Sequence, residues 1–549
     1  LGYVGTDTAL SVVEPEPADV GEDARQAWHR AFETEHRARF GYVRAGREVE
    51  VKAVRLRVLG AEGEPPVPPA GSGRAGEREV GAGPRPLRTT RAWFPDMGRV
   101  EAPVYEREAL LPGDRLEGPA LVLEATGTVV LDPGFTLEVD DRRVFRLRAE
   151  GEDRRAGPVD LEEADPVRLE VLGNRFMSVA EQMGAVLRNT SVSTNIKERL
   201  DYSCAVFDRD GGLVANAPHI PVHLGAMADT VAALRERFEP MPQGCVYVTN
   251  DPFAGGSHLP DVTVVTPVFL SGRSRPDFYV ASRGHHADLG GKTPGSMPAD
   301  SSCLEEEGVL IEAFPLVRDG HFEEARIRSV LGEGRFPARR PDDNVADLEA
   351  MVAANRAGVA LLEGLVGEVG LDVVQTTMRQ LQAAAALKVS RELARLAPGV
   401  HTFEDALDQG TPIRVRLEIE HAPVGQGALP ARMTIDFSGT GPAVAGNLNA
   451  PSAVVRAAVI YVLRSLVAER IPLNGGCLDP VEIRIPEGSI LDPPRGSAVV
   501  GGNVETSQRV VDVLLAALGR AAASQGTMNN VTFGDDAFGY YETIGGGAG

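Results

Sequence analysis

Histidines and carboxylates crowd into one part of this sequence. Five of its ten histidines lie between residues 219 and 286, where an even spread would give about one. Four carboxylates lie in or beside the same stretch, and the nine residues are His219, His223, His258, His285, His286, Glu198, Asp201, Asp251 and Asp261. Imidazoles combined with carboxylates are the donors that Zn²⁺, Mn²⁺ or Fe²⁺ takes in proteins. The stretch therefore predicts a divalent metal site.

The most specific local pattern is the loop Gly255–Asp261, which reads GGSHLPD. His258 and Asp261 are three residues apart, so one turn can aim both side chains at one ion. The two glycines allow the backbone to approach a ligand closely. Histidines beside glycine loops also bond to backbone carbonyl groups, and an HxxD pair can arise by chance, so a purely structural role is the alternative.

Further ligands depend on how the neighbouring strands run. One strand is expected to leave the loop after Asp261 and a second to return just before Arg283, which would bring His285 or His286 beside the loop. Asp201 or Glu198, at the entry to another expected strand, could supply a fourth ligand.

Other polar residues are expected to support the site. His219 and His223 are four residues apart, but the prolines around them argue against a helix, so we expect these histidines to face the substrate or the metal's ligands. Arg283 and Lys292 are candidate contacts for an anionic intermediate, with ordinary surface charge as the alternative.

The composition excludes several other classes of protein. Lys and Arg number 56 against 78 Asp and Glu, a net charge of −22 that argues against nucleic acid and anionic membranes as partners. No apolar run approaches the roughly 18 residues of a spanning helix. The four cysteines form no CxxC pair, and no P-loop, GxGxxG or GxSxG motif is present. A cytoplasmic protein is expected, and the missing initiator Met suggests a piece of a longer polypeptide.

Periodicity and turn residues predict an α+β protein with two domains, a small antiparallel β-rich domain at 1–152 and a large mixed α+β domain at 159–549. The small domain is expected to hold a helix at 23–40, a strand at 49–59 and β runs at 91–94, 102–105, 120–124, 128–131 and 135–139. Helices expected in the large domain start at Pro166 and cover 225–238, 345–396 with a break near 367–370, 453–470 and 506–523. Expected strands cover 203–208, 213–217, 246–249, 262–269, 278–282 and 432–437.

Several motifs occur in a characteristic order. They are NIKERLDYSC at 195–204, HIPVHLG at 219–225, NDPFAGGSHLPD at 250–261, SRGHHADLGG at 282–291, GNLNAP at 446–451 and TMNN at 527–530. Together they resemble the B component of the hydantoinase/oxoprolinase family, from about Pro158 to the end. The opening YVGTDTAL at 3–10 and the stretch 118–140 resemble the C-terminal end of the A component. An A tail joined to a B body is the layout of a fused 5-oxoprolinase.

The resemblance implies a set of metal ligands. His258, Asp261 and His285 carry over as ligands, with Asp201 as the fourth. Glu198 is the rival for that fourth position, because relatives use a carboxylate of this segment in different ways. The metal would be Zn, Mn or Fe.

The resemblance also implies a division of labour between two components. An actin-like ATPase in the A component would phosphorylate the carbonyl oxygen of a lactam, and the metal-holding B component would hydrolyse the activated ring, so that 5-oxoproline gives glutamate. His286 or His223 would move the water proton or bind the phosphoryl oxygens, and Arg283 would contact the anion.

The expected partners follow from this layout. They are a small-molecule lactam, a hydantoinase A-type ATPase domain or subunit that binds ATP and Mg²⁺, and further copies of the chain in a homo-oligomer. The ATPase part is expected before Leu1, and the B component is expected to continue past Gly549. The alternatives are an N-methylhydantoinase, an acetone or acetophenone carboxylase subunit, and a non-catalytic assembly fragment.

Overall fold

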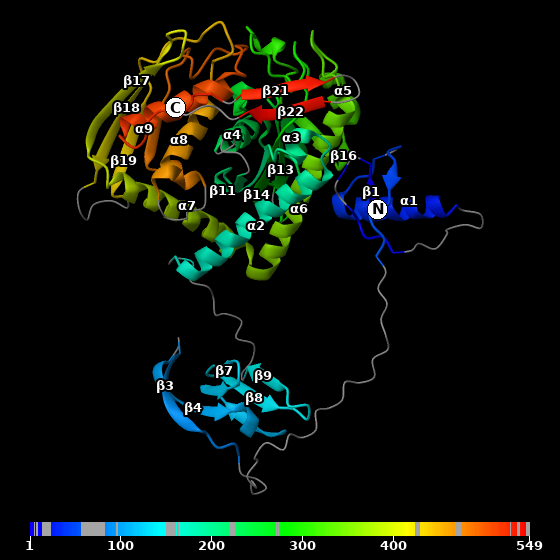
Figure 1. Cartoon of the computed structure of the whole chain (residues 1–549), viewed down its shortest axis with the longest axis vertical. Helices are drawn as coiled ribbons and strands as arrows, with labels where there is room; N and C mark the ends of the chain where they lie inside the picture. Colours follow the sequence, from blue (N-terminus) through cyan, green and yellow to red (C-terminus); the bar gives the residue numbers. More distant parts are fainter. Residues whose placement is uncertain are drawn as a thin grey trace. The chain divides into compact units, whose positions relative to one another are not determined.

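The structure, a computed structural model, describes residues 1–549 apart from 5, 7–8, 14–22, 45, 56–82, 95–96, 150–160, 162–163, 219–224, 271, 273, 423–428, 468–473, 528, 535–538 and 545–549. The chain separates into two compact units, one of which is Arg55–Asp160 (Figure 1). The other combines Leu1–Val54 with Leu161–Gly549. This grouping reflects packing, and the division at 152 and 159 stays a prediction.

The smaller unit is built from two β-sheets. One sheet holds β3 (Arg88–Phe94), β4 (Gly98–Glu106), β6 (Ala120–Leu123) and β7 (Thr128–Leu131), and the other holds β5 (Arg115–Glu117), β8 (Phe135–Val139) and β9 (Phe145–Ala149). Alternate residues point inward, so that Ala120 and Val122 join Leu131, Leu137 and Val139 in one core. The five expected β runs fall on β3, β4, β6, β7 and β8. The pair β4 and β6 is parallel rather than antiparallel.

The first residues of the chain pack onto the larger unit. Helix α1 (Ala24–Phe40) lies with a two-stranded ribbon of β1 (Gly2–Tyr3) and β2 (Val49–Glu50). Phe32 and Phe40 of α1 are buried in a cluster that includes Ala353 of the larger unit. Arg44 Nη2 donates to the carbonyl oxygens of Thr190 and Ala346, at 2.8 and 3.3 Å, which anchors this segment.

A seven-stranded antiparallel sheet forms the centre of the larger unit, in the order β11-β10-β14-β13-β12-β15-β16 (Figure 1). Its strands are β10 (Tyr202–Phe207), β11 (Leu213–Pro218), β12 (Val246–Thr249), β13 (Asp261–Val268), β14 (Phe278–His285), β15 (Phe314–Arg318) and β16 (His321–Phe322). Every side chain of β10, β12 and β14 is buried, because helices cover both faces of the sheet.

Different helices cover the two faces. On one face, α2 (Pro166–Thr190) and α6 (Pro341–Val369) bury residues such as Phe176 and Met351 against Val264 and Val280. On the other face, α4 (Ala226–Phe238) packs Met227 and Val231 on the opposite side chains of the same strands. Both faces are therefore dry, which allows polar groups at the strand ends to be buried as well.

A second core continues from the first. Helix α7 (Leu371–Leu393) joins a four-stranded sheet of β17 (Gly399–Ala406), β18 (Pro412–His421), β19 (Ala431–Asp436) and β20 (Val481–Arg484). Helices α8 (Ser452–Leu466) and α9 (Ser507–Ala517) pack on that sheet, and a π-helical turn, Gly502–Thr506, precedes α9. The remaining described helices and strands are α3 (Thr194–Lys197), α5 (Glu324–Leu331), β21 (Asn529–Gly534) and β22 (Gly539–Ile544).

The α+β class is confirmed, and the element boundaries differ in places. Helix α2 begins after the Asp165 N-cap as expected, and Gly370 breaks the long helical stretch into α6 and α7. The strand expected at 49–59 is wrong beyond Glu50, because residues 51–55 form no strand and are exposed, and residues 56–59 lie outside the described part. Helix α9 ends at Ala517, six residues before the expected end at 523. The exposed β17 was missed because it carries few apolar residues.

Helix α6 combines an apolar composition with a buried carboxyl group. Among the described helices it alone is long and apolar enough to cross a membrane, with a mean hydropathy of 1.2 over 18 residues. Its packing against the sheet explains that composition. Glu349 of α6 has a side chain that is only 19% exposed, and burial raises its pKa to about 7 although Arg44 lies 3.8 Å away.

We predict that Glu349→Gln stabilises the protein at pH 8 but not at pH 4.5. The raised pKa means that the folded state favours the protonated carboxyl, so stability is lost as the pH rises from 4.5 to about 7. The substitution should recover about 2–3 kcal/mol of the free energy of unfolding above pH 7. Urea unfolding at both pH values measures this. Glu363→Gln, an exposed site on the same helix, is the control, and equal behaviour of both variants would contradict the prediction.

Candidate metal centre

Three predicted ligands meet at one end of the central sheet. Strands β13 and β14 are antiparallel, and their register places Asp261 directly opposite His285. His258 stands in the turn before β13, where the Asp261 amide donates to the His258 carbonyl oxygen at 3.1 Å. One potential ligand atom from each of the three side chains lies within 4.8 Å of the others, and all three residues are at most 4% exposed. The expected convergence of an outgoing and a returning strand is thus observed, although β14 runs on to His285.

The glycine loop before His258 is held by close backbone packing. Gly255 has a φ of +86°, and a Cβ there would come within 2.3 Å of the Thr230 nitrogen in α4. Arg283 secures the same contact, because its Nη2 donates to the Gly255 carbonyl oxygen at 3.0 Å and to the Thr230 hydroxyl at 2.8 Å. The loop is therefore fixed to α4 before it presents His258.

Hydrogen bonds orient the His285 ring. Its Nδ1 lies 3.0 Å from the carbonyl oxygen of His286, which can only accept; we assign the proton to Nδ1 for this reason, which leaves Nε2 with its lone pair. The side-chain amide of Asn195 is 2.9 Å from the same Nδ1, and a 180° turn of that amide presents its oxygen to the N–H. Neutral imidazole with a free Nε2 is the form that binds metals.

Charges in the cluster act on each histidine differently. Burial lowers the pKa of His285, which keeps its ring neutral. Burial opposes the charged form of His258 most strongly, but Asp261, 3.2 Å from Nε2, together with Asp201 and Glu307 outweighs burial, so the pKa of His258 is raised. The Ser257 hydroxyl donates to the Asp261 carboxylate. Nδ1 of His258 is buried and has no hydrogen-bond partner among the described residues, as a nitrogen reserved for another ligand would be.

The two rivals for the fourth ligand occupy different environments. Asp201 is 8% exposed, and its negative charge acts on the pKa of both His258 and His285. Its backbone is tied to β14, since the His285 amide donates to the Asp201 carbonyl oxygen at 2.9 Å. Glu198, at the end of α3, is exposed. Asp201 is therefore buried and Glu198 exposed, and neither carboxylate belongs to the group of three side chains whose potential ligand atoms lie within 4.8 Å of one another.

The residues expected to act beside the metal are not grouped with it. His286 faces α6, where its Nδ1 lies 3.1 Å from the Asn344 amide nitrogen, and burial lowers its pKa to about 3. A base this weak accepts a proton poorly near pH 7. The guanidinium of Arg283 is fully buried, and burial lowers its pKa to about 10. His219 and His223 lie outside the described residues.

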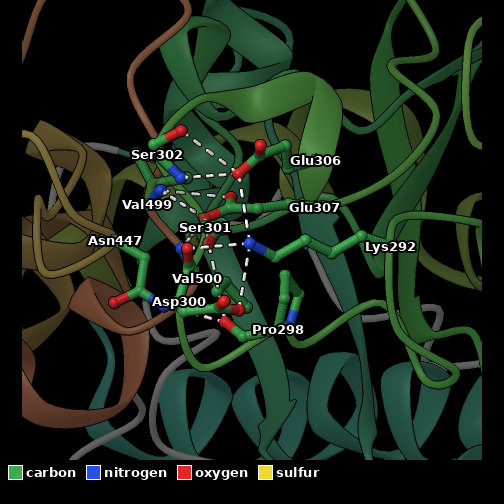
Figure 2. A network of polar contacts seen from close by, with 10 residues as sticks. All are labelled: Lys292, Pro298, Asp300, Ser301, Ser302, Glu306, Glu307, Asn447, Val499 and Val500. Carbon is green, nitrogen blue, oxygen red and sulfur yellow. Dashed lines mark hydrogen bonds and ion pairs between the residues drawn. The ribbon is translucent and has the colours of Figure 1, made fainter.

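Lys292 belongs to a polar network beside the cluster. Figure 2 shows its ammonium group between Asp300 and Glu306, with ion pairs of 2.9 and 3.3 Å. These carboxylates already neutralise the lysine. In the same network, Glu307 accepts hydrogen bonds from the backbone amides of Val499 and Val500 at 2.9 and 3.0 Å (Figure 2). Glu307 thereby joins the two cores.

Two contributors to the site were missed from the sequence. Asn195 begins the first family motif, but its contact with His285 depends on the short helix α3, which the motif does not reveal. Glu307 stands in the acidic run Glu305–Glu307, to which no part in the site was assigned from the sequence. Its charge in fact acts on His258. Burial of a glutamate inside a charged run has no signature in the sequence.

Comparison with known proteins assigns this chain to a family. The family model described as Hydantoinase B/oxoprolinase matches residues 165–549, and the Hydantoinase/oxoprolinase C-terminal domain matches 65–150. The chain belongs to the hydantoinase/oxoprolinase family. It is 44% identical to 5-oxoprolinase 1 of Arabidopsis thaliana and 42% identical to 5-oxoprolinase of Dictyostelium discoideum, over its whole length and over 44% and 42% of theirs. The chain thus spans less than half the length of these relatives.

The family fold is also seen in a solved structure. The ATP-dependent caprolactamase from Pseudomonas jessenii superimposes with a TM-score of 0.57 and 23% identity, over 67% of this chain and 62% of that one. At this identity the likeness concerns the fold alone. The resemblance of the motifs is confirmed, while the roles of individual site residues stay predictions.

We predict that Asn195→Ala weakens metal binding by about 10- to 100-fold, because a partner that orients a ligand histidine typically contributes that much. Titration of the purified chain with Zn²⁺ against a chromogenic chelator measures the affinity. Asn355→Ala is the matched control, since Asn355 is equally buried and bonds to the Val264 carbonyl oxygen of the same sheet. Unchanged affinity in Asn195→Ala, or an equal loss in both variants, would contradict the prediction.

Proposed function

We propose that this chain carries the metal-dependent, ring-opening half of an ATP-dependent cyclic amide hydrolase, with 5-oxo-L-proline as the substrate and glutamate as the product. The observation that carries the proposal is the buried cluster of His258, Asp261 and His285. The substrate is taken from the 5-oxoprolinase relatives that the chain matches over its whole length. Because the chain spans less than half of those relatives, the complete reaction is proposed for the complete protein.

The residues fit a divalent metal on chemical grounds. Two imidazoles and one or two carboxylates suit Zn²⁺, Mn²⁺ or Fe²⁺ and can leave a position open. Nδ1 of His258 has no hydrogen-bond partner among the described residues, and a proton on Nδ1 of His285 leaves Nε2 free, so each ring offers a nitrogen that can bind a metal. Asp201 is our fourth ligand. A scaffold protein would gain nothing from burying such a set of polar groups, since each costs free energy without a partner.

The chemistry divides between the ion and the chain. A divalent ion bound here would lower the pKa of water toward 7 and so supply a nucleophile near neutral pH. The chain's part is to hold His285 in the correct tautomer through the His286 carbonyl group and to exclude bulk water by burial. Arg283, locked to Gly255 and Thr230, fixes the loop and adds a buried positive charge beside the site.

An unactivated lactam resists this attack, because its carbonyl carbon is a poor electrophile. Phosphorylation of the carbonyl oxygen makes the carbon imidate-like and more electrophilic. Addition of water and cleavage of the ring C–N bond, with a proton passing to the departing amine, then give an acyl phosphate, which a second water hydrolyses to the carboxylate and phosphate. We propose that an A-type ATPase domain or subunit, binding ATP and Mg²⁺, performs the phosphorylation. Proton transfer by His286 or His223, contact of Arg283 with the anion, the homo-oligomer and the cytoplasmic location remain predictions from the resemblance.

The test separates metal binding from catalysis. In the complete protein, His258→Ala and Asp261→Ala should each lose bound metal and lower ring opening at least about 100-fold, because several kcal/mol of transition-state stabilisation depend on the ion. ATP hydrolysis is measured separately from ring opening. Metal content comes from plasma mass spectrometry. Full metal content together with full ring opening in either variant would end the proposal.

A second experiment distinguishes the two carboxylates. Asp201→Asn should lower metal affinity in the isolated chain, because it removes a charged donor beside both histidines, whereas Glu198→Gln should leave it unchanged, since Glu198 is exposed. Both variants remove one negative charge from the segment just before β10, so each serves as the control for the other. The reverse pattern would assign the fourth ligand to Glu198.

A further inference from the structure

One segment of the larger unit leads from helix α2 to the metal cluster. Residues 190–201, which we call the arm, begin at the last residue of α2, include the short helix α3 and end just before β10. The arm places the Asn195 amide 2.9 Å from Nδ1 of His285, and its last residue, Asp201, accepts the His285 amide at 2.9 Å through its carbonyl oxygen. The position of the arm therefore decides how Asn195 and Asp201 meet the cluster.

The first turn of the arm is held from outside. Helix α3 has only four residues, and its N-cap, Ser193, makes no side-chain capping bond. A helix this short is not stable alone. Instead, the buried Asp347 carboxylate of α6 accepts hydrogen bonds from the Val192 and Ser193 amides at 2.8 and 3.3 Å. At the other end of the arm, Leu200 has a φ of +56°, which is unfavourable for leucine and persists only where surrounding contacts enforce it.

A second contact to the arm comes from a distant part of the sequence. Arg44 Nη2 donates to the Thr190 carbonyl oxygen, where the arm begins, at 2.8 Å. The same nitrogen donates at 3.3 Å to the carbonyl oxygen of Ala346, one residue before Asp347. Arg44 is 7% exposed, and Glu349 lies 3.8 Å from its Nε. A single nitrogen thus ties the start of the arm to the part of α6 that carries Asp347.

Arg44 belongs to a segment that precedes the metal-holding part of the chain. It lies outside residues 165–549, the part that matches Hydantoinase B/oxoprolinase, but residues 1–54 pack on that part in one compact unit. Its own backbone is fixed there, because the Arg44 amide donates to the Tyr3 hydroxyl at 2.8 Å, and Tyr3 is buried with Phe32, Phe40 and Ala353. The body that holds the metal cluster therefore takes one of its supports from the start of the chain.

We propose that Arg44 is a positioning residue of the metal centre, which holds the arm so that Asn195 stays against His285 and Asp201 beside the cluster. The metal rests on the proposed function, whereas the placement of the arm does not. Loss of the Nη2 donor would release the Thr190 carbonyl group from α6 and let the arm move relative to β14. The metal centre would then respond to how residues 1–54 are held.

Metal binding to the 549-residue chain is the first test. Arg44→Met removes the donor but keeps an unbranched side chain, and it should weaken Zn²⁺ binding about 3- to 30-fold, as side chains that couple distant sites often do. The visible absorption spectrum of bound Co²⁺ should also change, because the ligand geometry changes, whereas a protein that is only less stable would keep the spectrum. Arg44→Lys should restore both properties, since one nitrogen makes both bonds and an ammonium group can replace it.

Hydrogen exchange measures the arm without any metal. Backbone amides of residues 191–204 should exchange about 3- to 30-fold faster in Arg44→Met, because local opening of the arm becomes easier. Peptides from β13 and β14 should stay as protected as in the unsubstituted chain. If the unsubstituted chain binds neither Zn²⁺ nor Co²⁺, the proposed function fails, and the exchange of the arm alone then decides whether Arg44 holds it.

Two further variants separate this role from general stability. Arg47→Met is the matched control, because Arg47 lies on the same segment and its guanidinium bonds to the Val4 carbonyl oxygen at 3.2 Å rather than to the arm. Asp347→Ala removes the other support of the arm and should act in the same direction as Arg44→Met, with residues 1–54 still docked. An unchanged exchange rate of the arm in Arg44→Met, an equal change in Arg47→Met, or an unchanged Co²⁺ spectrum of the metal-loaded variant would overturn the inference.

Discussion

The site depends on the register between β13 and β14. Antiparallel pairing sets Asp261 opposite His285, and the same pairing sets Thr263 opposite Arg283, so the predicted ligands and Arg283 share one face. A slip of one residue would turn His285 toward the other face and put a valine opposite it. Helices on both faces specify this register, because a slip would also exchange the apolar side chains that α4 and α6 bury.

Burial on both faces then decides what the polar groups can do. Around the cluster, the His285 ring, the Asp261 carboxylate and the Arg283 guanidinium each have protein partners that set their direction. Such groups are costly to bury, and their hydrogen bonds make the cost tolerable. Nδ1 of His258, by contrast, is buried without a hydrogen-bond partner among the described residues, so it remains available to a ligand.

Hydrogen bonds of Glu307 connect the segment after the metal cluster to the second half of the larger unit. Glu307 reaches from the segment after the metal cluster to the backbone amides of Val499 and Val500, just before the π-helical turn. Asn447 extends this junction by donating to the Pro298 carbonyl oxygen at 2.8 Å (Figure 2). The contacts at this junction therefore also shape the surroundings of His258, on whose pKa the charge of Glu307 acts.

Much of the molecule could be predicted from local sequence. The capped start of α2, the break at Gly370, the strands around the GGSHLPD loop and the family itself depend on neighbouring residues or ordered motifs, which are visible in a single sequence. The approach of His285 or His286 to His258 and Asp261 was also predicted, from an outgoing and a returning strand, and the family resemblance selected His285. Tertiary structure alone decided that Asp201 is buried and Glu198 exposed, that His286 turns to α6, that Asn195 contacts His285, and that the charge of Glu307 acts on His258. Each of these depends on which distant element packs against the residue, and packing between elements far apart in the chain leaves no local pattern.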